Sequence, residues 1–169
     1  MLRHTVIETS LGPLTLVAED HDLVGVYYDD HWTKPDVNTF GQLVQCESDP
    51  LLAEAAAQLR SYLTNERRHF DLPYRTAGNQ FQEAVWQKLI RIPYGKTVTY
   101  GEIAEELGNI HLARQVGQAV GANPLSIIIP CHRVMGKHAK ITGYAGGVQR
   151  KQHLLQLEEA LYPADGRLF

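Results

Sequence analysis

The sequence of 169 residues predicts an α+β fold, with a β-sheet and one helix in the first half and mostly helices in the second. Short runs of β-branched and aromatic residues, separated by turn-forming residues, fill positions 4–30. Helix-capping patterns recur after residue 78. The charge balance also changes, because residues 1–76 hold 6 Lys and Arg against 12 Asp and Glu, whereas residues 77–169 hold 10 against 7. We therefore expect two domains, 1–76 and 77–169, and the more basic second one is compatible with a partner that carries phosphate.

The first domain is predicted to be a β-meander followed by a helix. Extended runs at 4–9, 14–19 and 23–30 are separated by the turn-forming stretches "SLGP" and "EDHD". Residues 50–66 carry an apolar stripe at helical spacing, made of Leu52, Ala55, Leu59, Tyr62 and Leu63. Residues 67–78 then favour a linker that contains a strand.

The second domain is predicted to begin with three helices. Asn79 is followed by Gln82, and Thr99 by Glu102, which is the spacing of a capping box. The first of these helices carries an apolar stripe made of Phe81, Val85, Trp86 and Leu89. A third helix follows the second after a short turn, over 112–122. Two short helices across a tight turn predict a helix-turn-helix unit, and an αα-corner that only packs is an equally good interpretation.

The helix over 112–122 has one face that carries almost no side chains, because Ala113, Gly117 and Gly121 recur at every fourth position. Each glycine inside a helix costs roughly 1 kcal/mol relative to alanine. Such a face favours the close approach of another backbone. The neighbour is either a packed helix or a DNA groove, and Arg114 stands beside the bare face.

Composition argues against a membrane-spanning, exported or metal-binding protein. No apolar run approaches the ~18 residues that span a bilayer, and the first ten residues lack the apolar core of a signal peptide. Cys46 and Cys131 show no metal-ligand spacing, and the eight histidines are scattered. We therefore expect reduced thiols, a cytoplasmic location and no metal site.

Cys131 stands in "SIIIPCHRV", at the end of an apolar run and beside a histidine. The run 124–130 is too short and too β-branched for a helix, and it predicts a buried strand or extended segment. A buried cysteine is usually inert, whereas a cysteine with a base nearby can be a nucleophile. Adjacent side chains point in different directions, so we expect His132 to act on Cys131 through an ordered water. A carboxylate would hold the histidine tautomer, and on the helix "VQRKQHLLQLEEAL" Glu158 lies nearer the apolar side than Glu159.

The motifs around Cys131 match a known family. "IPCHRV" is followed by "TGYAGGVQRKQHLLQLE", and upstream stand "NP", "ARQVG", "VTYGEIAEELG", "IPYG" and "FQEAVW". Together they cover about residues 78–160, and this part of the chain resembles the O6-alkylguanine-DNA alkyltransferases, or methylated-DNA–protein-cysteine methyltransferases. The resemblance implies an RNase H-like N-terminal sheet with a helix. It also implies a mostly helical, winged helix-turn-helix-like C-terminal domain that carries the active cysteine.

The resemblance gives roles to five residues near the reacting sulfur. Cys131 is the alkyl acceptor, and His132 takes its proton through water. Glu158 orients and stabilises His132, and Asn123 braces the turn around the site. Tyr100 assists rotation of the nucleotide and donates to a ring nitrogen of the base, so that guanine leaves as a neutral species.

The resemblance also assigns the DNA contacts and the alkyl pocket. Arg114 enters the stack where the flipped base was, and its helix, with Ala113, Gln115 and Gly117, approaches the minor groove. The backbone carbonyl of Val134 receives the amino group of the base. Met135 corresponds to a position near the pocket, and one wall is formed by the loop residues Gly143, Tyr144, Ala145, Gly146 and Gly147. The pocket must be apolar to prefer an alkylated base, and we expect Tyr144, Ile141 and Pro130 to make it so.

Four positions depart from the family pattern. Ile110 stands where proline is usual, Leu112 replaces a small residue and Gln115 replaces an alanine. These three bear on how deeply the helix enters the groove. Ala139 stands where glycine is common, which bears on the alkyl groups that are accepted. The N-terminal cysteines of zinc-binding members are absent.

The implied function is DNA repair by direct reversal of damage. The protein would bind double-stranded DNA, flip an O6-alkylguanine or O4-alkylthymine out of the stack and transfer the alkyl group irreversibly to Cys131. Each molecule would act once, without a cofactor, and we expect it to be monomeric when free, with cooperative assembly on DNA left open. The alternatives are a non-catalytic binder of alkylated DNA, a cysteine hydrolase with Cys131, His132 and Glu158 as its triad, and a helix-turn-helix transcription factor.

Overall fold

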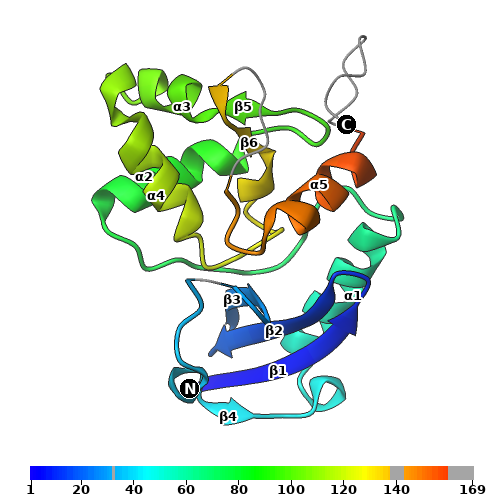
Figure 1. Ribbon diagram of the computed structural model, residues 1–169. Helices are drawn as coiled ribbons and strands as arrows, with labels where there is room; N and C mark the ends of the chain where they lie inside the picture. The colour runs from blue at the N-terminus through cyan, green and yellow to red at the C-terminus, as the bar shows by residue number, and fades with distance from the viewer. Residues whose placement is uncertain (32, 138–142, 160–169) are drawn as a thin grey trace. The chain divides into compact units, whose positions relative to one another are not determined.

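The computed structural model describes residues 1–31, 33–137 and 143–159 (Figure 1). The chain divides into two compact units. Residues 1–76 and 124–128 form the first unit, and residues 77–123 form the second together with the described residues from Ile129 onward. Within the described ranges, no helix is both long enough and apolar enough to cross a membrane.

The first unit is built on a four-stranded sheet with the order β3–β2–β1–β4. Its strands are β1 Leu2–Thr9, β2 Gly12–Glu19, β3 Asp22–Tyr28 and β4 Gln42–Leu43. The first three pair antiparallel in sequence order, which confirms the predicted meander, while β4 pairs parallel with β1. The sequence does not predict β4, because its two exposed residues are too few to show an alternating pattern.

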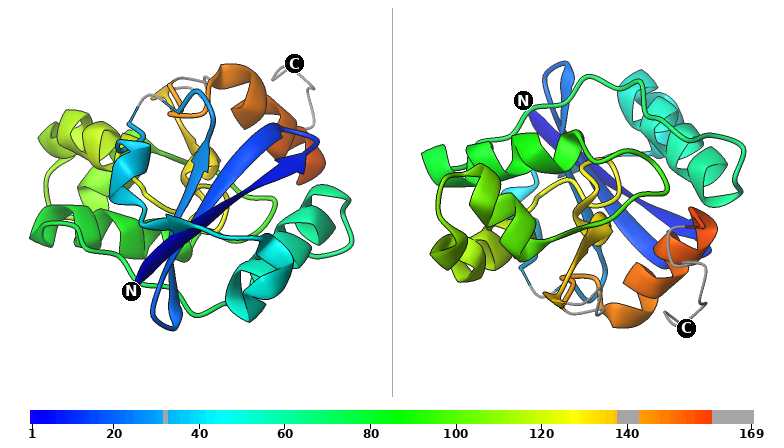
Figure 2. Two further views of the ribbon diagram at one scale, coloured as in Figure 1. Left: turned by 90° about the horizontal axis from the view of Figure 1, so that it is seen from below. Right: turned by 90° about the horizontal axis from the view of Figure 1, so that it is seen from above.

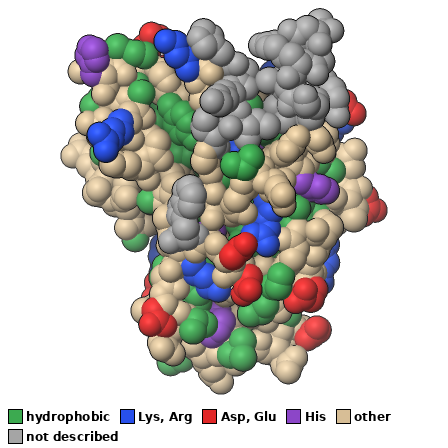
Figure 3. Space-filling view, in the orientation of Figure 1, with side chains coloured by type: hydrophobic (Ala, Val, Ile, Leu, Met, Phe, Trp, Pro, Cys, Tyr) green, Lys and Arg blue, Asp and Glu red, His purple; other side chains and the backbone are tan. Residues whose placement is uncertain are grey.

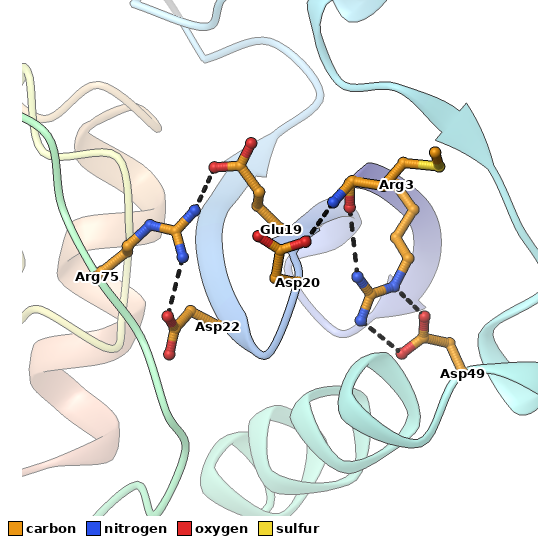
Figure 4. Close-up of polar contacts among 7 residues, drawn as sticks. Arg3, Glu19, Asp20, Asp22, Asp49 and Arg75 are labelled. Carbon is orange, nitrogen blue, oxygen red and sulfur yellow. Dashed lines mark hydrogen bonds and ion pairs between the residues drawn. The ribbon is translucent and has the colours of Figure 1, made fainter.

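One helix, α1 Pro50–Leu63, packs against this sheet (Figures 1 and 2). Asp49 caps it by accepting hydrogen bonds from the backbone N–H groups of Leu51 and Leu52. The predicted apolar stripe is entirely buried, at Leu52, Ala55, Leu59, Tyr62 and Leu63. Arg3 of β1 forms an ion pair with Asp49, so the start of the helix is tied to the sheet (Figure 4). The short 3-10 helices η1 Val37–Thr39 and η2 Cys46–Ser48 precede α1.

The linker that follows α1 is attached to the β2–β3 hairpin. Arg75 forms ion pairs with Glu19 and with Asp22, the second at 2.9 Å (Figure 4). Tyr74 forms a single parallel bridge with Leu23. The strand that the sequence predicts in this linker is therefore reduced to one bridge.

The segment 124–128 joins the first unit beside β3 and then turns. Leu125 forms a parallel bridge with Val26, and residues 126–129 form a turn in which Ile127 has a φ of +72°. The predicted burial of this apolar run is confirmed, but the predicted extended conformation is wrong beyond Leu125. A β-branched residue in the left-handed region costs on the order of 1–3 kcal/mol, and only its surroundings hold it there, so residue preferences do not indicate it.

The described part of the second unit contains four α-helices, namely α2 Gln80–Ile90, α3 Tyr100–Glu106, α4 Ala113–Gly121 and α5 Val148–Leu157. Both predicted capping boxes are present, with Asn79 and Gln82 at α2 and with Thr99 and Glu102 at α3. The 3-10 helix η3 Ile110–Leu112 connects α3 to α4. Helix α4 packs against both α2 and α3 (Figure 2).

A two-stranded parallel sheet brings two distant parts of the second unit together. Its strands are β5 Val98–Thr99, just before α3, and β6 Val134–Met135. The 3-10 helix η4 Cys131–Arg133 leads directly into β6. The cysteine motif is therefore fixed beside the start of α3, the helix that carries Tyr100.

Candidate active site

Cys131 is buried at the start of η4, with only 4% of its surface exposed. The backbone around it is held by local hydrogen bonds. The side-chain amide of Asn123, just after α4, donates to the carbonyl oxygen of Ile129 at 2.9 Å, and the N–H of Cys131 donates to the same oxygen at 2.7 Å. Asn123 therefore fixes the backbone immediately before the cysteine.

His132 and Glu158 form a buried pair at 2.7 Å between Nε2 and Oε2. Both side chains are fully shielded from solvent, whereas Glu159 is exposed, so Glu158 is the carboxylate that lies beside the histidine. An ionised carboxylate only accepts hydrogen bonds, so this pairing assigns the hydrogen of His132 to Nε2 and leaves Nδ1 as an acceptor. Within the described part of the chain, Nδ1 has no hydrogen-bond partner.

Arg133 holds the same carboxylate and was not among the residues singled out from the sequence. Its Nε donates to Oε1 of Glu158 at 2.8 Å, one terminal nitrogen donates to Oε2 at 3.1 Å, and the other donates to the Ile92 carbonyl oxygen at 2.7 Å. The guanidinium also lies 5.6 Å from the ring centre of Tyr94. This fork fixes the carboxylate that in turn fixes His132.

The electrostatics of this group keep His132 neutral. Burial lowers the pKa of His132 well below its ordinary value, and the charges of Arg133 and Lys151 lower it further. Burial raises the pKa of Glu158 to about 8 against a hydrogen bond from the Gly95 backbone. The ionised form is favoured by geometry, because the charged Arg133 donates two hydrogen bonds to this carboxylate. Arg133 itself keeps a pKa of about 10 despite burial, so its guanidinium is charged at neutral pH.

Lys151 is a second buried cation that the sequence motifs do not indicate. It lies on α5 with no exposed surface, and its Nζ donates to the carbonyl oxygen of Val134 at 2.5 Å. Its position on the same side of α5 as Leu154 and Leu155 is the signal that could have found it, because a lysine in an apolar stripe is rare.

Burial and the neighbouring groups have opposite effects on the ionisation of the Cys131 thiol. Burial raises its pKa, while a hydrogen bond with Asn123 and the positive charge of Lys151 act in the opposite direction. Tyr144 also contributes a hydrogen bond that favours the thiolate. Besides a base that removes the proton, these neighbouring groups can therefore also activate the sulfur.

Four of the five predicted DNA-contacting residues lie around a pocket between α3 and α4. It has a volume of about 610 Å³, and its lining includes Tyr100, Ala113, Arg114 and Gly117. Arg114 and Gln115 are exposed on α4, and Gln115 does not line the pocket. On the face drawn in Figure 3, basic, acidic, histidine and apolar side chains lie next to one another over the region of α3.

Gly117 is not required by internal packing. A Cβ atom added there would meet only ring atoms of Tyr100, at 3.9 Å, which is an ordinary van der Waals contact. The first alternative for the bare face of α4, tight packing on a neighbouring helix, therefore does not explain this glycine.

The predicted pocket residues on both sides of the cysteine lie in the same unit. Among them, the buried positions are Pro130, Val134, Met135, Tyr144, Ala145 and Gly146. The hydroxyl of Tyr100 donates to the carbonyl oxygen of Gly143 at 3.5 Å, so α3 contacts the loop that leads to α5. Ile141 and Ala139 lie outside the described residues.

Two of the unusual residues of the helix-turn-helix have apolar neighbours. The side chain of Ile110 lies against Gly101 of α3, where an added Cβ would be 3.2 Å from its Cδ1 atom. Leu112 lines a second pocket with Phe81, Ala84 and Leu107, among others. Among the described residues, no group of three or more His, Cys, Asp or Glu side chains could hold a metal ion.

Both parts of the chain match one family. Residues 80–160 match "6-O-methylguanine DNA methyltransferase, DNA binding domain", and residues 2–76 match "6-O-methylguanine DNA methyltransferase, ribonuclease-like domain". These two matches account for nearly all of the described residues.

Individual relatives are similar to this chain over nearly its whole length. A methylated-DNA–protein-cysteine methyltransferase of Mycobacterium bovis is 41% identical, covering 100% of this chain and 99% of its own. A constitutive one of Bacillus subtilis is also 41% identical, with 94% and 96% covered. The crystal structure of Mycobacterium tuberculosis OGT in complex with DNA is similar with a TM-score of 0.83 at 38% identity, covering 96% of each chain. The chain therefore belongs to the 6-O-methylguanine DNA methyltransferase family.

Proposed function

We propose that this protein repairs alkylated DNA by moving the alkyl group from O6 of guanine onto its own Cys131. The proposal depends mainly on one observation: Cys131, His132 and Glu158 are all buried, and Nε2 of His132 lies 2.7 Å from Oε2 of Glu158. The chain also matches this family. DNA repair by alkyl transfer is the activity for which its relatives are named. We assign DNA binding and transfer to residues 77–169 and treat residues 1–76 as a separate domain.

Activation of the sulfur begins with loss of its proton. Nδ1 of His132 is the acceptor nitrogen, and its lack of a partner within the described residues supports a water that links it to the thiol. The proton would pass from Sγ to this water and from the water to Nδ1. Glu158 stabilises the resulting charge on the imidazole through the Nε2 hydrogen bond, while Arg133 keeps Glu158 in place.

Transfer is a single displacement at the alkyl carbon. The Sγ–C bond forms as the C–O6 bond breaks, and the electron pair of the broken bond stays on the guanine. The Tyr100 hydroxyl would donate a proton to a ring nitrogen, so the base leaves neutral. The product is a thioether that water does not cleave under cellular conditions, so each molecule would act once and need no cofactor.

Access to O6 requires the nucleotide to leave the stack. Flipping costs a few kcal/mol, and Arg114 would offset part of that cost by filling the gap in the duplex. The exposed positions Arg114 and Gln115 and the bare Gly117 support an approach of α4 to the minor groove. The flipped base would then lie among the buried residues that flank the cysteine in the sequence, at Pro130, Val134, Met135, Tyr144, Ala145 and Gly146.

Several finer points belong to the same proposal. We expect O4-alkylthymine as a second substrate and a monomer in the absence of DNA, with cooperative assembly on DNA left open. Transfer needs a reduced thiol, which agrees with the predicted cytoplasmic location.

Peptide mass analysis after single-turnover reaction tests the proposal directly. The protein is incubated with a duplex that contains O6-methylguanine, digested and weighed. We expect one added methyl group on the peptide that contains Cys131, and none on the Cys46 peptide. Cys131→Ala should bind the duplex and leave the lesion intact, whereas Cys46→Ala, the matched control, should transfer normally.

The same experiment separates the alternatives. A non-catalytic binder would leave both cysteine peptides unmodified, although it would bind the lesion. A cysteine hydrolase would remove the methyl group repeatedly without a lasting mass change on Cys131. A transcription factor would bind one duplex sequence regardless of the lesion, and Cys131→Ala would not alter it.

A further inference from the structure

Lys151 is a fully buried lysine inside the candidate active site, and the mechanism above does not use it. Its side chain has no exposed surface, and the neighbouring Leu154 and Leu155 of α5 are equally buried. Removing an ammonium group from water costs several kcal/mol, and lysines are almost never fully buried unless they are paired. The fold therefore retains a costly charge at this place.

The contacts of Lys151 direct its charge toward the cysteine motif. Nζ donates to the carbonyl oxygen of Val134 at 2.5 Å, and Val134 follows directly on the 3-10 helix that begins with Cys131. On α3, the ring centre of Tyr100 lies 6.0 Å from the same nitrogen. A carbonyl dipole and an aromatic face both favour the charged form of the lysine.

Lys151 and Cys131 affect each other reciprocally. Burial lowers the pKa of Lys151 to about 8, and negative charge on Cys131 opposes this shift. Burial raises the pKa of Cys131, and positive charge on Lys151 opposes that shift. Each of the two groups therefore favours the ionised form of the other.

The other charged and titratable groups of the site do not take over this role. Arg133 is engaged with the carboxylate of Glu158 through two hydrogen bonds, and burial keeps His132 neutral. Tyr100 on α3 lies over the ammonium, whereas Asn123 after α4 and Tyr144 before α5 form hydrogen bonds with the thiol. The charges of Arg133 and Lys151 both act on His132.

We propose that the ammonium of Lys151 is the counter-ion that stabilises the thiolate of Cys131 during alkyl transfer. This inference rests on the proposed function, because it assigns the sulfur as nucleophile. The proton of the thiol still leaves through water toward His132, and Lys151 keeps its own proton throughout. When the Sγ–C bond forms, the sulfur becomes neutral and the ammonium loses the negative charge that it faced.

The test measures thiol ionisation without DNA. In a Cys46→Ala background, the rate of alkylation of Cys131 by iodoacetamide is followed against pH. Lys151→Gln keeps an N–H donor for Val134 but removes the charge, Lys151→Met removes both, and Lys151→Arg keeps the charge. The exposed Lys96→Met is the matched control. Thermal unfolding of each variant shows whether the fold is retained.

We expect both neutral variants to move the titration of the thiol to higher pH. For every pH unit by which the midpoint rises, the thiolate fraction at neutral pH falls about tenfold, and transfer from O6-methylguanine DNA should slow in parallel. Lys151→Arg should restore most of the rate, and Lys96→Met should titrate like the parent. The inference is overturned if folded Lys151→Gln titrates like the parent, or if Lys151→Arg is as slow as Lys151→Gln.

The outcomes also separate this inference from the proposed function. A thiol whose titration depends on Lys151, in a protein that never acquires a methyl group from DNA, would support the ion pair and refute the transferase. A protein that acquires the methyl group on Cys131 at the same rate with and without the Lys151 charge would refute the ion pair alone.

Discussion

Two arginines, one in each unit of the molecule, bind carboxylates in very different surroundings. Arg75 pairs with Glu19 and Asp22 at the edge of the N-terminal sheet, and its side chain is 42% exposed (Figure 4). Arg133 pairs with Glu158, whose side chain has no exposed surface. The charged groups are the same kinds, and burial is the main difference between the two sites.

The difference decides what each arginine can contribute. Water and salt screen the exposed pairs, so they add little to stability. The buried pair has no water to replace a lost partner, so each group depends on the others. Because Arg133 fixes the buried Glu158, this carboxylate can hold His132 in one tautomer. The buried site can therefore support chemistry, whereas the exposed one ties a linker to a hairpin.

Replacing the two arginines in parallel should give the largest contrast. Arg133→Met leaves the carboxylate of Glu158 buried without its partner, and we expect a loss of about 3–5 kcal/mol in the free energy of unfolding. Arg75→Met should leave the urea midpoint unchanged within error. Denaturant unfolding of both variants measures this, and equal effects would contradict the comparison.

Glu158→Gln should slow alkyl transfer about 100-fold, because the charge that stabilises the protonated imidazole is lost. The exposed neighbour Glu159→Gln is the matched control and should transfer at the parent rate. Single-turnover transfer from methylated duplex measures both. Parent-like transfer by Glu158→Gln would remove the carboxylate from the mechanism.

Acid should destabilise the protein through His132. Its pKa is lowered well below 6.5 in the folded state, so the unfolded chain binds a proton that the folded chain does not. The stability contributed by the neutral ring is complete above about pH 6.5 and falls by about 1.4 kcal/mol for each pH unit below it. Because burial raises the pKa of Glu158 and so acts in the opposite direction, unfolding at several pH values should show this slope as the difference between the parent and His132→Gln, and the exposed control His153→Gln should follow the parent.

Gly117→Ala should have the smallest effect and should act in opposite directions on folding and on binding. The added methyl group meets only the Tyr100 ring at 3.9 Å, and alanine is the better helix former by about 1 kcal/mol, so stability should rise slightly. Affinity for duplex DNA should fall, because the face of α4 becomes thicker. Fluorescence anisotropy with labelled duplex checks this. An unchanged affinity would mean that the Gly117 face of α4 does not contact the DNA groove.

Much of the fold follows from local patterns in the sequence. Alternation and turn residues predict the three-stranded meander, and capping boxes place the starts of α2 and α3. The turn after Leu125 does not follow, because Ile127 adopts a left-handed conformation that only its tertiary surroundings stabilise. β4 also stays hidden, because it is defined by its pairing with β1 and by no pattern of its own.

The candidate site shows the same division. The motif and the resemblance point to Cys131, His132 and Glu158, and the buried side of the last helix favours Glu158, the glutamate that contacts His132 in the structure. Arg133 and Lys151 are missed, because charged side chains are expected at the surface. Their roles depend on distances between residues far apart in the sequence, such as the 2.8 Å contact between Arg133 and Glu158.

The most direct test of the central claim is a titration that counts methyl groups removed from DNA against molecules of protein. With excess O6-methylguanine duplex, we predict a plateau at one methyl group per protein molecule, all of it recovered as S-methylcysteine at Cys131. Continued removal beyond that ratio would contradict the account, as would repaired DNA with an unmodified Cys131.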